Sequence, residues 1–357
     1  MNTDKKNQHY IPKFYLRNFS YQNNEKQIGI FNIHKNFFYP TSKLKTQGSK
    51  NFFYGYDGRI EDGLSKIEGK LSAIIRNIIT DQKIPVKETE AYIKLLIFVG
   101  LTHLRNPVTI SYIKQSREAA KRSLFELDPN VNVDDFIPKA RHDEAISLAL
   151  SSLRDVVLNI TDLNCKLIVN RTTKPFISSD FPIVKYNQFL ERKNWQHGKT
   201  GYGNIGLQII IPINPYLSLF FYDSEVYKIG FKKSKLHNIS DEKEIEQFNI
   251  LQILNCVEHV YFNHEVSENY MRDLFNKSSK YKKANEVIAE THFGFKKGEK
   301  IDFENKRKNV LAIGTTDCEI KLNIAGLKAH SKATYIKLGN RASVLRKLAF
   351  ENMRNNR

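Results

Sequence analysis

Apolar residues recur at helical spacing through the second quarter of the chain. Between positions 58 and 160 they return every third or fourth residue, which predicts a mainly helical layer. One helix is expected over 88–104, because Arg105, Asn106 and Pro107 stop the pattern there. Further helical patterns cover 109–127 and 138–158. The first helix of the layer carries its apolar residues at Ile60, Leu64, Ile67, Leu71, Ile74, Ile75 and Ile78.

Outside this layer the apolar runs are short and are broken by Gly, Pro and Asn, which is typical of strands. Residues 10–56 predict a small antiparallel β segment, and 165–235 predict a mixed or antiparallel sheet with flanking helices. A helix from Asp241 to Glu258 with Ser240 as its N-cap follows. The expected strand runs are 27–33, 166–169, 176–177, 183–184, 207–211, 217–222 and a late one at 310–324.

These patterns predict an α+β fold in two parts. The first is a core over residues 1–265, mainly helical over 58–160 and mainly β over 165–235. The second is a basic, β-containing C-terminal subdomain over residues 266–357.

The chain carries a net charge of +18, and the excess lies at its two ends. Residues 1–50 hold nine Lys and Arg against two Asp and Glu, and residues 271–357 hold twenty against nine. The 220 residues between them are neutral. Basic ends attract phosphates, so we expect nucleic acid as a partner. An AT-rich genome would also enrich Lys, Asn, Ile, Phe and Tyr, without any role in binding.

The apolar runs are too short to cross a membrane. None approaches the roughly 20 residues that span a bilayer, and the polar opening lacks the apolar stretch of a secretory signal. We therefore expect a cytoplasmic protein without membrane contact. Cys165, Cys256 and Cys318 are odd in number and far apart, which favours reduced core residues over disulfides or a zinc site.

The segment from Gln8 to Phe19 holds the densest group of hydrogen-bonding side chains in the chain. Its His9 is a candidate general acid or base, because imidazole titrates near neutrality. Its cations suit a phosphate and its aromatic rings suit unpaired bases. The candidate substrate-binding residues of this segment are Tyr10, Lys13, Tyr15, Arg17 and Asn18. A salt bridge from Arg17 to Glu68 and core packing of the rings are the structural alternatives.

Two carboxylates elsewhere are candidates for the same site. Glu68 interrupts the apolar face of the first helix, and Asp180 comes directly before a Phe-Pro bend. Both are candidate catalytic residues and ligands of Mg²⁺, and Asp180 is alternatively the residue that orients His9. A solvated position for Glu68 and a turn cap for Asp180 are the structural alternatives. The remaining candidates for substrate contact are Arg105, Arg171 and Ser179, of which Arg171 would neutralise phosphate charge.

The opening Gln8-His9-Tyr10-x-Pro12-x-x-Tyr15-Leu16-Arg17-x-Phe19 resembles the start of an uncharacterised bacterial family, a domain of unknown function with an HYxPxxYLxxF sequence. The Phe176-Ile177-x-Ser179-Asp180-x-Pro182 block and the helix stop at Arg105-Asn106-Pro107 resemble later landmarks of that family. The resemblance covers about residue 8 to about residue 262. It implies no established activity, so it groups these residues without assigning roles to them.

Common catalytic motifs are absent from the sequence. It has no Walker-type phosphate loop, no Rossmann glycine pattern, no GxSxG elbow and no HExxH helix. Asp302 followed by Glu319 and Lys321 loosely matches the Asp, Glu-x-Lys arrangement of restriction-type nucleases and forms a competing candidate site.

The leading hypothesis from the sequence is a nucleic-acid-binding protein that cleaves RNA or DNA phosphodiester bonds in a toxin or phage-defence setting. His9 would shuttle a proton, Arg17 and Arg171 would stabilise charge on the phosphate, and Mg²⁺ is the one cofactor implied. A protein partner encoded nearby is compatible with it. One alternative is a non-catalytic sensor or adaptor whose N-terminal polar residues form a structural network. Another is an enzyme acting on a small nucleotide.

Overall fold

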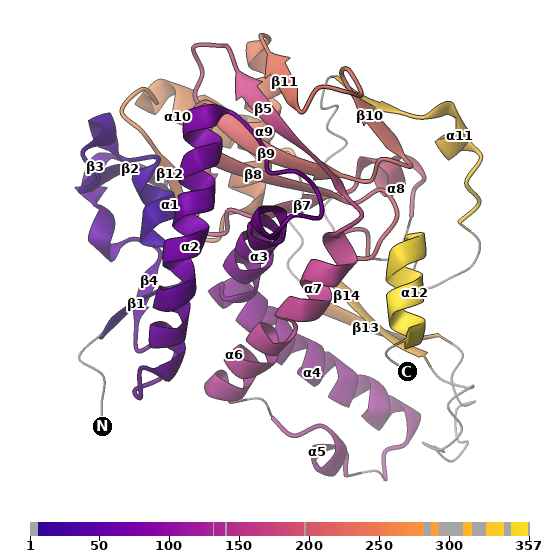
Figure 1. The fold of residues 1–357 in the computed structure, drawn as a ribbon. Coiled ribbons are helices and arrows are strands. Elements are labelled where there is room, and N and C mark those ends of the chain that lie inside the picture. The colour runs from indigo at the N-terminus through magenta and orange to yellow at the C-terminus, as the bar shows by residue number, and fades with distance from the viewer. Residues whose placement is uncertain are drawn as a thin grey trace.

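The computed structural model describes residues 6–130, 132–139, 141–195, 198–281, 287–292, 310–315, 326–338 and 344–355. These residues form a helical layer, a five-stranded sheet, and a second sheet accompanied by two further helices (Figure 1). Most strand pairs are antiparallel, which confirms the predicted α+β class. Within the described ranges, none of the helices combines the length and the apolar character that a membrane span requires.

The helical layer follows the predicted boundaries closely. Thr89 caps its second helix by accepting a hydrogen bond from the Tyr92 amide, and Asn106 caps the next by accepting one from Val108. Pro107 occupies the first turn of that helix, where a missing N–H costs nothing. The predicted helix stop at Arg105 to Pro107 is therefore confirmed. The layer comprises α2 (Arg59–Asp81), α3 (Glu90–Leu104), α4 (Pro107–Leu127), α5 (Val133–Phe136), α6 (His142–Ser151) and α7 (Leu153–Ile160).

The five-stranded sheet is buried on both faces. Leu167 and Val169 of β5 pack with the helical layer, whereas Ile168 packs into a second core with Phe248. Because both faces are buried, the sequences of its strands are nearly continuous runs of apolar residues. The order is β11-β5-β9-β8-β7, and the β11–β5 pair is parallel. The strands are β5 (Asn164–Asn170), β7 (Val184–Tyr186), β8 (Gln208–Asn214), β9 (Leu217–Tyr222) and β11 (Leu236–Ile239), with α8 (Gln188–Arg192) between β7 and β8.

A four-stranded antiparallel sheet of order β3-β2-β12-β6 brings the N-terminal part of the chain against later segments. Its strands are β2 (Gln27–Asn32), β3 (Phe37–Lys43), β6 (Ser178–Ser179) and β12 (His259–Phe262). Helices α9 (Glu242–Asn255) and α10 (Glu268–Ser278) supply apolar side chains to the second core. The opening motif forms β1 (Asn7–His9), which pairs with β4 (Ser49–Asn51), and α1 (Lys13–Arg17).

The described C-terminal residues attach to this core at several places. Strand β15 (Leu327–Ala329) pairs with β10 (Tyr227–Ile229), and the antiparallel pair of β13 (Val287–His292) and β14 (Val310–Thr315) lies against α4. Beyond α11 (Ser331–Thr334), Arg346 precedes α12 (Lys347–Asn355) and donates hydrogen bonds to Asp162 and to the carbonyl oxygen of Asn204.

Two local predictions are wrong. The side chain of Asp241, not that of Ser240, caps α9, and the helix ends at Asn255 before the chain turns into β12. Phe176 and Ile177 do not form a strand, because their amides donate to the Pro215 carbonyl oxygen and to the Asn249 side chain instead of to a strand ladder, and β6 begins only at Ser178. The competing site of Asp302, Glu319 and Lys321 lies outside the described residues.

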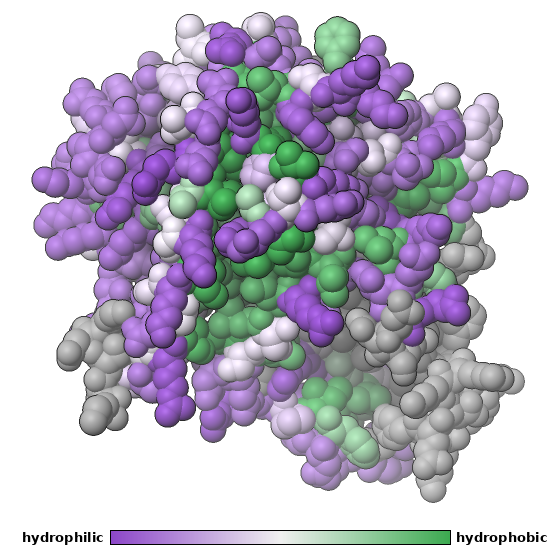
Figure 2. All heavy atoms as spheres, in the orientation of Figure 1, coloured by the Kyte–Doolittle hydropathy of each residue, from purple (hydrophilic) through white to green (hydrophobic). Residues whose placement is uncertain are grey.

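Figure 2 shows one face of the molecule in the same orientation. Hydrophobic side chains gather near its centre, over α3 and between α2 and α7, and hydrophilic side chains cover most of the remainder.

Candidate functional site

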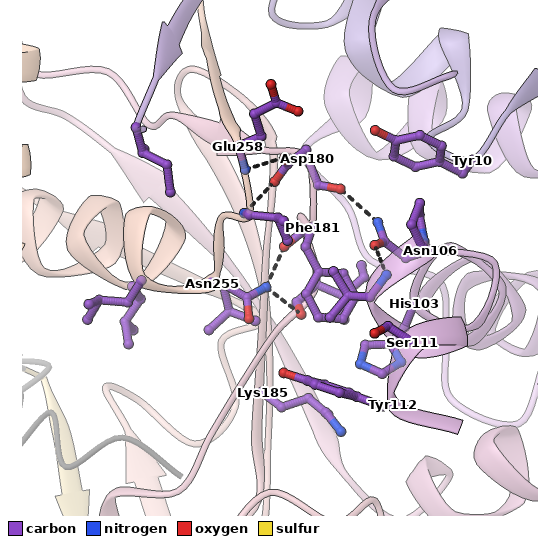
Figure 3. Close-up of a pocket in the computed structure, with 18 of the residues that line it drawn as sticks. Tyr10, His103, Asn106, Ser111, Tyr112, Asp180, Phe181, Lys185, Asn255 and Glu258 are labelled. Carbon is purple, nitrogen blue, oxygen red and sulfur yellow. Dashed lines mark hydrogen bonds between the residues drawn. The ribbon is translucent and has the colours of Figure 1, made fainter. Parts of the chain in front are cut away.

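A cavity of about 710 Å³ opens where several segments meet. They include the α3–α4 junction, the chain from Asp180 to Tyr186, the end of α9 with the start of β12, the opening motif at Tyr10, and the segments that carry His34, Lys50 and Thr200 (Figure 3). Its wall is a mixture of aromatic rings and polar groups, as in most ligand sites. The aromatic, charged and amide residues that line it are Tyr10, His34, Lys50, His103, Asn106, Tyr112, Asp180, Phe181, Lys185, Tyr186, Asn255 and Glu258.

Asp180 lies at this cavity, but the protein's own backbone occupies its carboxylate. One carboxylate oxygen accepts a hydrogen bond from the amide of Val257 at 2.8 Å, and the other accepts from Glu258 and His259 at 2.7 and 3.0 Å. In Figure 3 the carboxylate turns toward the Glu258 backbone, and the Asp180 carbonyl group turns toward Asn106. Asp180 therefore fixes the start of β12 beside the cavity, which matches the turn-cap alternative more closely than a metal ligand.

The α3–α4 junction links two of the candidate carboxylates through neighbouring residues. The Asn106 side chain caps α4 and donates a hydrogen bond to the Asp180 carbonyl oxygen at 2.7 Å. Arg105 is 1% exposed and binds Glu68 at 2.6 Å, but its Nε has no hydrogen-bond partner in the described part of the chain. The salt bridge expected for Glu68 is thus present with Arg105 and not with Arg17. Arg105 is a buried structural cation, not a cavity residue.

The other polar groups of the opening motif mostly bind distant backbone. Gln8 accepts a hydrogen bond from the Tyr54 amide at 2.6 Å and donates one to the Gly55 carbonyl oxygen at 3.0 Å. The Tyr15 hydroxyl donates to the Pro212 carbonyl oxygen at 2.7 Å. In the later block, Ser179 donates to the Gln252 side chain at 2.9 Å. Each bond joins segments that are distant in the sequence, so these residues stabilise the fold and do not line the cavity.

His9 is the imidazole that the sequence favours, and it lies in β1 with only 7% of its surface exposed. Its Nε2 lies 3.1 Å from the Lys45 carbonyl oxygen. Burial, and next the nearby charge of Lys13, lower the pKa of His9 to about 4. The side chain is therefore neutral at pH 7, and it is not among the cavity residues.

The remaining predicted cations are not brought together. Arg17 is exposed on α1 and lies 3.7 Å from Glu25, and Arg171 donates to Asn238 at 3.2 Å at the end of β5. Lys13 is exposed, and Asn18 ends α1. Of the predicted substrate-binding residues, only Tyr10 lines the cavity. Its hydroxyl points toward Asp180 and Glu258 (Figure 3).

His103 is one of the cavity residues that sequence reasoning missed, together with Lys50, Tyr112 and Lys185. It is 5% exposed, its ring packs 4.9 Å from Phe181 and 5.5 Å from Tyr202, and its Nδ1 has no hydrogen-bond partner within the described ranges. Burial, followed by the charge of Lys185, holds the pKa of His103 well below its usual range. A sequence signal did exist, because His103 is a titratable residue in the last turn of an otherwise largely apolar helix.

The candidate residues do not fit Mg²⁺. Three backbone amides occupy the carboxylate of Asp180, and Arg105 holds that of Glu68. Across the described residues, no group of three or more His, Cys, Asp and Glu side chains is placed to hold a metal ion. No step of a reaction is therefore assigned to a metal at these residues.

Comparison with known proteins gives one match. Searches among curated proteins and among solved structures found no similar protein. A family model described as a protein of unknown function, DUF4238, matches residues 7–266, which is most of the chain and includes every cavity residue named above. The match agrees with the resemblance found in the sequence to a family without assigned activity. The chain therefore belongs to the DUF4238 family of proteins of unknown function.

Proposed function

We propose that the chain binds single-stranded nucleic acid and takes one nucleotide of it into the cavity beside Asp180. The observation that carries the proposal is the composition of the cavity wall. A volume of about 710 Å³ is within the range of small-molecule sites. The rings of Tyr10, Tyr112 and Phe181 supply flat apolar surface for a base. Lys50 and Lys185 lie on the same wall and would bind its phosphates.

The hydrogen bonds of Asp180, Asn106 and Gln8 support this placement indirectly. Asp180, Asn106 and Gln8 bind backbone groups of other segments and therefore pre-form the wall. A pre-formed site loses less conformational freedom when it binds a ligand. These three residues would thus build the site, while the rings and lysines would contact the nucleotide.

Fluorescence anisotropy with labelled RNA and DNA single strands tests the proposal. The double substitution Lys50→Gln and Lys185→Gln should weaken binding roughly tenfold and make the salt dependence shallower by about 1.4 in the log–log slope, since each phosphate contact contributes about 0.7 on a single strand. The control Lys26→Gln with Lys43→Gln changes the same charge at exposed positions that do not line the cavity. If the wild-type chain binds no strand, or both pairs weaken it equally, a nucleotide site in the cavity is excluded.

Cleavage of the bound strand is a second candidate, and His103 is the observation that favours it. A neutral imidazole with an unpartnered Nδ1 can accept a hydrogen bond from an attacking oxygen and take its proton as the new oxygen–phosphorus bond forms. The bond to the leaving oxygen then breaks, that oxygen takes up a proton from water, and the protonated His103 returns its proton to water, while Lys185 stabilises charge on the phosphate. His103→Gln should retain strand binding and lose cleavage. Retained cleavage in this variant would remove His103 from the chemistry.

A further inference from the structure

A second positively charged surface lies at the turn that joins β10 to β11. The sequence Phe231-Lys232-Lys233-Ser234-Lys235 forms this turn, and we call it the lysine loop. All three lysines are exposed, and the ring of Phe231 is 87% exposed, more than any other large hydrophobic side chain described. The loop lies in the part of the sequence whose net charge is zero, so the charge of the two ends does not explain it.

The lysine loop has a defined shape. Beneath it Lys166, only 2% exposed, donates hydrogen bonds of 2.7 Å to the carbonyl oxygens of Phe231 and Ser234. The Lys235 carbonyl oxygen accepts a further bond from the amide of Leu167 at 2.8 Å. The backbone of the loop is thus tied to β5 at three points. A buried ammonium group serves as one of these ties and adds positive charge from below.

Like charges are concentrated on the strands beside the loop. Lys228 of β10 and Lys328 of β15 stand directly opposite each other in the antiparallel register, and both are exposed. Like charges in facing positions of a strand pair are destabilising. Five lysines are therefore close together here: Lys228, Lys328 and the three of the lysine loop. In the described part of the chain, none of the five forms an ion pair with a carboxylate. Burial, and next the charge of Lys235, lower the pKa of Lys166, in keeping with a concentrated positive field.

The arrangement fits a linear polyanion better than a lipid surface. Membrane-binding loops insert several apolar side chains together, whereas here one largely exposed ring is surrounded by lysines. The lysines also continue from the loop onto the β-strands β10 and β15. Such a row of positive charges matches the row of phosphates along a nucleic-acid strand. An exposed ring next to phosphate-binding lysines can stack on an unpaired base.

We propose that the lysine loop, with Lys228 and Lys328, is a second binding surface for single-stranded nucleic acid, with Phe231 stacking on a base. This inference rests on the proposed function and adds to it a contact away from the cavity. In Figure 1, β10 and β11 lie near the top, whereas α4, whose first turn lines the cavity, lies in the lower half. A single nucleic-acid strand would have to be long to contact both the cavity and the lysine loop.

The test compares strand lengths in the full chain. The triple substitution Lys232→Gln, Lys233→Gln and Lys235→Gln should weaken binding of a strand of about 30 nucleotides at least tenfold and reduce the log–log salt slope by about 2. Binding of a strand of about 5 nucleotides, which the cavity can take alone, should stay within about twofold. Phe231→Ala should weaken binding of the 30-nucleotide strand about fivefold or more. The log–log salt slope should change little, because stacking releases no counterions.

The matched control is the triple substitution Lys26→Gln, Lys43→Gln and Lys66→Gln, which removes the same charge at exposed positions elsewhere. If this control weakens binding of the 30-nucleotide strand as much as the loop variant does, binding depends only on the net charge of the protein, and the inference is overturned. If the cavity variants weaken binding and the loop variants do not, the proposed function stands and this surface alone is rejected. Binding of the wild-type chain to anionic phosphatidylserine vesicles, lost in Phe231→Ala, together with no binding of strands, would reject both.

Discussion

At the scale of single residues, the side chains that look most reactive in the sequence largely hold segments together. Asp180 accepts hydrogen bonds from amides 77 to 79 positions later, and Tyr15 donates to an oxygen 197 positions away. The sequence analysis selected these residues as candidates, and the structure places Asp180 and Tyr10 at one cavity. Their roles were not predictable, because a carboxylate or phenol serves catalysis or cross-linking according to partners that no local pattern reveals.

His9 gives a prediction for the pH dependence of stability. Its pKa is about 4 in the folded protein, against an ordinary value of 6.5. Between these values the unfolded chain binds a proton that the folded chain does not, so the free energy of unfolding should fall as pH decreases from 6.5 to 4. His9→Gln should remove this contribution, on the order of 2 kcal/mol, and flatten the dependence.

Urea unfolding at several pH values measures this contribution. The control is His34→Gln, at an exposed position, which should leave the pH dependence as in the wild type. Parallel curves for wild type and His9→Gln would mean that burial does not keep His9 neutral.

At the scale of elements, the ends of the helices could largely be predicted from the sequence, whereas the side-chain contacts that join one element to another could not. The stop at Arg105 to Pro107 follows from proline geometry, but the pairing of Arg105 with Glu68 depends on how α2 and α3 pack. Arg346 shows the same limit. Its guanidinium, in a residue 6% exposed, donates to Asp162, to the carbonyl oxygens of Tyr202 and Asn204, and to Asn159. It thereby fastens α12 and the loop around Tyr202, which packs against His103.

Arg346→Ala should therefore loosen that loop and lower the free energy of unfolding by about 3–5 kcal/mol, because it leaves buried carbonyl groups and Asp162 without their cation. Limited trypsin digestion with mass spectrometry should then detect faster cleavage after Lys199, which is 7% exposed in the intact protein. Arg354→Ala removes an exposed arginine, and with it one trypsin site, from α12, and should leave the rate of cleavage after Lys199 unchanged. Equal digestion of the two variants would contradict a fastening role for Arg346.

At the scale of the whole molecule, the α+β class followed from the sequence because the spacing of apolar residues differs between helices and strands. The strand order could not be predicted, because no local sequence pattern determines that β12 lies between β2 and β6 or that β11 runs parallel to β5. These partners are chosen by the two cores, which share the five-stranded sheet. A sheet common to both cores should couple their unfolding.

The coupling can be measured with the single tryptophan. Trp195 belongs to the second core, whereas Leu71 of α2 lies in the first and is 2% exposed. Leu71→Ala should cost about 2–5 kcal/mol. The loss should lower the midpoint of Trp195 emission and the midpoint of far-ultraviolet circular dichroism equally. Val86→Ala, at a 73% exposed position, is the control. A Trp195 transition that stays at the wild-type midpoint would mean that the two cores unfold separately.

The bond between Tyr15 and Pro212 also has a consequence for biosynthesis. The ribosome adds Tyr15 to the chain 197 residues before Pro212, whose carbonyl oxygen accepts its hydrogen bond. At about 5–20 residues per second, the opening segment waits roughly 10–40 s before its partner exists. During that interval the Tyr15 hydroxyl lacks its acceptor, and β8, the strand that carries Pro212, has not been made. The nascent chain therefore presents an aromatic N-terminal segment that a chaperone of the translating ribosome can bind, and the family motif can reach its native position only after most of the chain has been made.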